Sequence, residues 1–185
     1  TSAIVHYLDS LDLFVGQDLS SKAILISKVL ADAYGLSNPE FRCADSISDW
    51  DNRLFDAVVA CPPFAYRINQ DRIAFDAESQ DWNFRTLEEL YFCRAFNRNQ
   101  AKVAVLLDSV GFCFRKGGDY SIRKYLIDNN LLDMVIALPA NILFGTSIPS
   151  VIVVCKVGRK ADEPIKFIHA EEYYCGSNLR NRELD

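Results

Sequence analysis

The chain has 185 residues, of which 50% are hydrophobic and 24% are charged, a balance typical of a globular domain with its own core. The formal net charge of −5 argues against a protein that binds nucleic acid over its whole surface, although it allows a local basic patch. No apolar stretch approaches the roughly 20 residues that cross a bilayer, and we expect no secretory signal peptide.

The chain has six cysteines and two histidines, and no two cysteines form a C-x-x-C pair. A zinc site is therefore not expected. Most of the cysteines lie in apolar runs such as FRCAD, YFCRAF and VIVVCKV. We interpret them as buried, reduced thiols of a cytoplasmic protein.

Strands and a helix alternate in the first part of the chain. Residues 12–18 predict a short strand, after a segment at 2–10 that resembles the end of a helix. The next segment has apolar residues at helical spacing; Ser20 or Ser21 can cap its start, and Gly35 is expected to end it.

The same alternation continues to the end of the chain. The polar segment 65–85 is long for a connector, and it leads into a helix with Thr86 as N-cap and Glu89 in the capping-box position. Another helix is predicted within 117–130. The remaining predicted strands are 40–46, 54–61, 101–108, 132–139, 149–157 and 164–170.

The strands are continuous apolar runs, which is typical of a parallel sheet covered by helices on both faces. Only nine residues join the strands 132–139 and 149–157, too few for a crossover helix, so these strands are expected to pair antiparallel at one edge. The predicted fold is α/β, a Rossmann-like, doubly wound and mostly parallel sheet with an antiparallel edge hairpin.

Ligands of such sheets bind beyond the carboxyl ends of the strands. Asp18 and Asp45 stand at two successive strand ends. An acid in the first position can bind the ribose diol of a nucleotide-type cofactor, and an acid in the second can accept a hydrogen bond from its adenine amino group. The alternative for each acid is a role as a helix cap or dipole partner.

The predicted strand 54–61 stops at Cys61, Pro62, Pro63 and Phe64. The two prolines stiffen the backbone, so carbonyl groups and one side chain can point at a single polar group beside an aromatic ring. This arrangement suits a planar base that carries an exocyclic amine. The alternative is a proline stop on a buried strand.

These motifs, taken in order, resemble the modification subunits of type I restriction–modification systems, which are S-adenosylmethionine-dependent adenine-N6 DNA methyltransferases. FDAVVACPPF resembles the family's Asn-Pro-Pro-Phe/Tyr motif except at Cys61, and VGQD and CADSI resemble its two acid-bearing strand ends. AKVAVLLDSVGF and the stretch from SIRKYL to VIVVCK resemble its downstream strands and hairpin. The resemblance covers about residues 12–157.

The resemblance implies a class I methyltransferase domain over residues 1–170 and a C-terminal extension at 171–185. In the family the target base is flipped into the site, two acceptors bind its amine hydrogens and the aromatic residue stacks on it. The catalytic residues implied here are Cys61, Pro62, Pro63 and Phe64, and those implied to bind S-adenosylmethionine are Asp18, Leu19, Asp45 and Ser46.

Two features depart from the family pattern. Cys61 replaces an asparagine, and a thiol is a weak acceptor, so the lost hydrogen bond costs roughly 1–3 kcal/mol, or ten- to a hundredfold in rate. A nucleophilic cysteine, as in cytosine-C5 methyltransferases, is the alternative, although there the cysteine follows the proline. The chain also starts at TSAIVHYL, which resembles the helix after the family's glycine-rich loop, so the first strand and loop are expected to be missing and cofactor binding weak or absent.

The basic residues of FRKGGDYSIRK form a candidate DNA-phosphate patch, or else a solvated helix face; they are Arg115, Lys116, Arg123 and Lys124. The expected partners are DNA and, by resemblance, a specificity subunit and a restriction subunit or a second copy. Two other functions stay open: a catalytically dead methyltransferase-like module that binds DNA or a subunit, and a methyltransferase that acts on RNA or on a protein glutamine.

Overall fold

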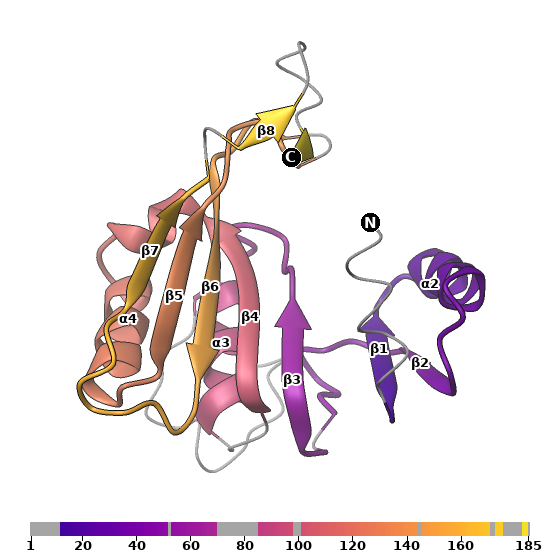
Figure 1. The fold of residues 1–185 in the computed structure, drawn as a ribbon. Helices are drawn as coiled ribbons and strands as arrows, with labels where there is room; N and C mark the ends of the chain where they lie inside the picture. Colours follow the sequence, from indigo (N-terminus) through magenta and orange to yellow (C-terminus); the bar gives the residue numbers. More distant parts are fainter. Residues whose placement is uncertain are drawn as a thin grey trace. The chain divides into compact units, whose positions relative to one another are not determined.

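The computed structural model describes residues 12–51, 53–69, 85–97, 101–143, 146–170, 173–175 and 183–184. These residues form two compact units, one up to Asp51 and one from Arg53 onward (Figure 1). The helix expected at 2–10 and most of the segment 65–85 lie outside the described residues.

The first unit consists of β1 (Phe14–Asp18), α2 (Ser21–Ala33) and β2 (Pro39–Cys43), and the two strands pair in parallel. Ser20 caps α2, because its Oγ accepts a hydrogen bond from the Ala23 N–H at 3.3 Å. The helix ends at Ala33, and Gly35 follows with a φ of +70°, which suits a residue without a Cβ and stops the helix. The predicted helix start and end are thus confirmed.

The second unit contains a five-stranded sheet in the order β3-β4-β6-β5-β7. Its elements in chain order are β3 (Phe55–Ala60), α3 (Leu87–Asn97), β4 (Ala101–Ser109), the 3₁₀ helix η3 (Val110–Cys113), α4 (Gly118–Asp128), β5 (Leu132–Ala137), β6 (Ser150–Lys156) and β7 (Lys166–His169). A short antiparallel pair, β8 (Tyr174–Cys175) and β9 (Glu183–Leu184), follows.

The predicted antiparallel pairing of β5 with β6 is confirmed, but its position at the edge is wrong. β6 lies between β5 and β4 and is antiparallel to both, and β7 adds in parallel on the outer side of β5. The residues explain this order: Val151, Val153 and Cys155 of β6 are fully buried, as suits a central strand, whereas all of β7 is exposed.

The α/β class with a mixed sheet is confirmed, but the described strands do not form one continuous sheet. Among the described residues, β1 and β2 pair only with each other. Within the second unit, α3 and α4 lie on the same face of the five-stranded sheet (Figure 1). The expected cover of both faces by helices is therefore not seen among the described residues of this unit.

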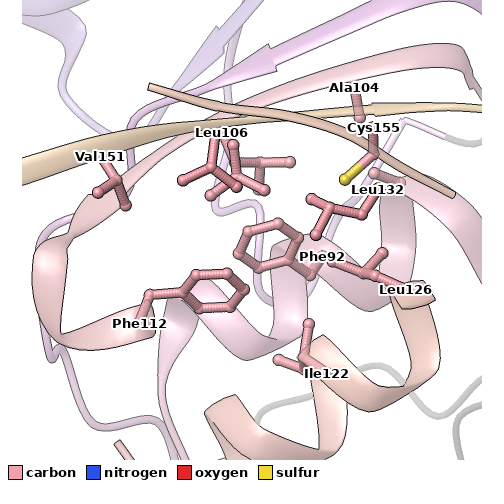
Figure 2. Packing of buried hydrophobic residues seen from close by; sticks show 12 residues of the cluster. Phe92, Ala104, Leu106, Phe112, Ile122, Leu126, Leu132, Val151 and Cys155 are labelled. Atoms are coloured by element: carbon pink, nitrogen blue, oxygen red, sulfur yellow. The ribbon is translucent and has the colours of Figure 1, made fainter. Parts of the chain in front are cut away.

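The core of the second unit lies between the sheet and these two helices. Figure 2 shows Phe92 of α3 and Phe112 of η3 packed between Leu106 on the sheet and Ile122 of α4. The two aromatic rings stack with centroids 5.0 Å apart. This core holds α3 and α4 against the sheet.

Five cysteines are free thiols, but only two of these five are buried. Cys93 and Cys155 lie in the core, whereas Cys43, Cys61 and Cys113 are exposed. The expectation of burial is wrong for these three because they stand where the chain leaves a strand or helix, and not within its apolar run. None of the described helices has the length and apolarity to span a membrane.

Candidate functional site

The chain makes a tight corner directly after β3. Pro62 is buried, Phe64 is half-buried, and Cys61 and Pro63 are exposed. The Tyr66 N–H reaches the Pro63 carbonyl oxygen at 3.4 Å, which closes a turn. The corner therefore places Cys61 and Pro63 at the surface while Pro62 anchors it to the unit.

Ala65, inside this turn, has a φ of +53°. Among the described non-glycine residues with positive φ it alone is not an asparagine, and a side chain with a Cβ is disfavoured there by about 1–2 kcal/mol. Its N–H donates a hydrogen bond to Oε1 of Glu88, the second residue of α3. The Leu87 N–H donates to the Tyr66 carbonyl oxygen at 2.9 Å, so the start of α3 holds the corner at two points.

The Cys61 thiol shows no sign of activation as a nucleophile. Desolvation by neighbouring atoms raises its pKa, although the residue lies at the surface. A reactive cysteine needs the opposite shift, because the thiolate is the attacking species. The geometry thus favours a replaced hydrogen-bond acceptor over a nucleophile.

The first turn of α3 carries the capping box expected from the sequence. Glu89 Oε2 accepts hydrogen bonds from the Arg85 N–H at 2.6 Å and the Thr86 N–H at 3.3 Å. In return, Thr86 Oγ1 accepts from the Glu89 N–H at 3.5 Å. Gly118 lies against this carboxyl group, since a Cβ there would stand 1.7 Å from Glu89 Oε1.

Asp108 is the last but one residue of β4 and lies beside the corner. Ala60 pairs with Leu106 in the parallel β3–β4 ladder, so Asp108 lies level with Pro62. Its side chain is 1% exposed and its Oδ1 accepts the Ser109 N–H at 2.5 Å. Burial, with the nearby Glu88 charge, raises the pKa of Asp108 to about 7.

The predicted DNA-binding residues lie around η3 and α4, and three of the four have protein partners. Arg115 Nε pairs with Asp119 Oδ2 at 2.5 Å, and Arg123 Nη2 donates to the Arg115 carbonyl oxygen at 2.8 Å. Lys124 pairs with Asp128, one helical turn on, and Lys116 is exposed. Arg115 and Arg123 thus help to fix the chain between η3 and α4.

The predicted cofactor residues gather at one end of the first unit. Asp18 pairs with Cys43 in the parallel ladder, so Asp45 follows just beyond the same end. Asp18 is exposed, and its Oδ1 accepts the Ser20 N–H at 2.7 Å. Ser20 and not Asp18 caps α2, which weakens the cap alternative for this acid.

Asp45 also orders its own loop, since its Oδ1 accepts the Ile47 N–H at 2.9 Å. Ser46 follows it half-buried, and Leu19 is 68% exposed beside Asp18. An exposed leucine beside a strand-end acid offers an apolar surface to a flat ring.

The sequence alone indicated no role for Glu88 or for Asp108. The signal for Glu88 was present as two consecutive acids at a helix start, of which the capping box uses one. The fold brings Glu88 and Asp108 together next to the corner, where the charge of Glu88 raises the pKa of Asp108.

The N-6 DNA methylase family model matches residues 13–185. The chain belongs to this family. The type I restriction enzyme MpnII methylase subunit of Mycoplasma pneumoniae is 37% identical over 136 residues, which are 69% of this chain and 25% of that protein. The MjaVII methylase subunit of Methanocaldococcus jannaschii is 30% identical over 90% of this chain and 27% of its own length.

Solved structures show the same fold. The type I restriction–modification methyltransferase subunit from Streptococcus thermophilus has a TM-score of 0.76 at 22% identity, over 94% of this chain and 39% of that one. A putative class I S-adenosylmethionine-dependent methyltransferase from Listeria monocytogenes has a TM-score of 0.70 at 15% identity, over 92% of this chain and 54% of that one. This N-6 DNA methylase chain spans about a quarter of the length of the curated relatives it matches.

Proposed function

We propose that the chain is the methyl-transfer domain of an S-adenosylmethionine-dependent adenine-N6 DNA methyltransferase. The observation that carries the proposal is the corner after β3, in a chain of the N-6 DNA methylase family. Its rigid prolines, half-buried Phe64 and surface-exposed Cys61 form one short backbone turn held by α3.

The corner is suited to hold an amino group by its hydrogens. The Pro63 carbonyl oxygen already accepts the Tyr66 N–H, so we assign the amine acceptor to the Pro62 carbonyl oxygen. Phe64 supplies the ring on which a flipped base stacks. Holding the amine in line with the incoming methyl group is most of what such a site needs to do.

Asp18 and Asp45 are the residues proposed to bind the cofactor, with Leu19 and Ser46 beside them. Asp18 is exposed at a strand end, with one oxygen fixed by the Ser20 N–H and a carboxylate edge suited to a ribose diol. When bound, S-adenosylmethionine supplies an electrophilic methyl group.

We further propose that the protein acts in the cytoplasm on DNA, together with a specificity subunit and a restriction subunit or a second copy. The curated relatives are methylase subunits of type I restriction enzymes, which supports this set of partners. Lys116 is exposed and suited to a DNA phosphate, and Arg115, Arg123 and Lys124 are proposed to contribute through their remaining N–H groups.

A second candidate is a methyltransferase-like module that binds DNA or a subunit without catalysis. The residue that favours it is Cys61, because a thiol with a raised pKa cannot replace an amide oxygen as acceptor.

The two candidates differ in their response to Cys61→Asn. We would measure labelled methyl transfer from S-adenosylmethionine into mixed-sequence unmethylated DNA by the wild type, Cys61→Asn and the control Cys61→Ala. For an enzyme weakened by one lost hydrogen bond, Cys61→Asn should exceed the wild type by about tenfold or more, and Cys61→Ala should not. No gain with asparagine would favour the binding module.

A further inference from the structure

We infer that Glu88 is a positioning residue for the corner after β3: by accepting the Ala65 N–H it holds the turn that presents Pro62 and Phe64 to the target base. The inference rests on the proposed function, because positioning matters only if the corner holds a substrate. Glu88 itself does not touch the reacting atoms.

The turn needs a stabilising contact from a residue outside it. Ala65 has a φ of +53°, a strained conformation for alanine, and the Tyr66–Pro63 hydrogen bond that closes the turn is long at 3.4 Å. The hydrogen bond from the Ala65 N–H to Glu88 Oε1 acts on the strained residue itself.

Helix capping does not account for Glu88. The neighbouring Glu89 accepts the Arg85 and Thr86 N–H groups at the start of α3. Glu88 is 1% exposed, and its Oε2 has no hydrogen-bond partner among the described residues. Burying a carboxyl group in this way is costly, so its described bond to the corner is the role that explains its position.

Glu88 also acts on a neighbouring buried acid, Asp108. Asp108, level with Pro62, is influenced by Glu88 on α3, by Asp119 on α4, and by Arg115 between η3 and α4. Asp108 Oδ2 and Ser109 Oγ are also buried without a partner among the described residues. Removing the Glu88 charge should therefore lower the pKa of Asp108.

The test compares Glu88→Gln, which keeps an acceptor oxygen of the same shape, with Glu88→Leu, which fills the same space without an acceptor. Glu89→Gln is the matched control, because Glu89 lies in the same helical turn and accepts the Arg85 and Thr86 N–H groups. The first readout is hydrogen exchange of the Ala65 amide by NMR. We expect Glu88→Leu to speed this exchange at least tenfold, and Glu88→Gln and Glu89→Gln to change it by less than threefold.

The second readout is methyl transfer in a Cys61→Asn background. We expect Glu88→Leu to lower kcat about tenfold with KM for S-adenosylmethionine unchanged, and Glu88→Gln to restore it. If Glu88→Leu does not fold, the same two measurements are made on Ala65→Gly/Glu88→Leu. Glycine adopts the positive φ freely, so this pair should recover part of the loss.

Unchanged Ala65 exchange in Glu88→Leu would overturn the inference, and so would faster exchange with unchanged kcat. Absence of methyl transfer in the Cys61→Asn parent would refute the proposed function instead. The amide exchange alone would then decide whether Glu88 holds the corner.

Discussion

At the scale of single residues, the raised pKa of Asp108 predicts how the stability of the chain depends on pH. Burial holds its pKa at about 7, against 3.8 for an unperturbed aspartate. The folded state therefore keeps a proton that the unfolded state releases, and stability falls as the pH rises from about 4 to about 7. Above about pH 7, the full cost of ionising this buried carboxyl group lowers the free energy of unfolding.

Asp108→Asn should remove this cost, because asparagine stays neutral. The variant is expected to be more stable than the wild type at pH 8, by at most on the order of 4 kcal/mol, and the difference should shrink towards pH 4. Urea unfolding at a series of pH values measures it. Asp162→Asn, in an exposed turn, controls for loss of a surface charge, and equal pH dependence of Asp108→Asn and the wild type would contradict the account.

At the scale of elements, α3 and α4 meet where Gly118 touches Glu89. An alanine at Gly118 would place its Cβ 1.7 Å from Glu89 Oε1, and Glu89 is only 5% exposed and caps α3. We expect Gly118→Ala to destabilise the chain by about 1–2 kcal/mol, the usual cost of a lost cap.

Chemical denaturation with an unchanged m-value measures this effect. Ser121→Ala, on the exposed side of the same helix, is the control and should change stability by less than about 0.5 kcal/mol. If Gly118→Ala were as stable as that control, the close packing of Gly118 against Glu89 would not contribute to the stability of the chain.

The sequence predicted those elements whose signals are local. The Ser20 cap, the Gly35 end and the Thr86–Glu89 capping box each depend on residues within one turn of a helix, and each is present in the structure. The place of β6 was missed because loop length shows that two strands pair but not which further strand pairs on the other side.

The candidate site was predictable to the same extent. The corner at Pro62 and the strand-end position of Asp18 follow from short motifs. The bond from Ala65 to Glu88 joins residues 23 positions apart, and the cluster around Asp108 draws on three elements. No spacing rule reports such contacts.

At the scale of the whole molecule, family membership and the class I methyltransferase fold predict use of S-adenosylmethionine. Calorimetric titration should show weak, saturable binding, and Asp18→Ala should weaken it at least tenfold, because a charge-assisted hydrogen bond to the ribose is lost. Asp32→Ala, an exposed acid on α2, is the control and should bind as the wild type does. Equal affinities of Asp18→Ala and the control would contradict the assignment of Asp18.

The most direct test of the central claim is the position of the transferred methyl group. DNA would be incubated with deuterated-methyl S-adenosylmethionine and either the wild type or Cys61→Asn, then digested to nucleosides and analysed by mass spectrometry. The account predicts label on N6 of deoxyadenosine, with more in Cys61→Asn. Label on cytosine, or none with either protein, would contradict it.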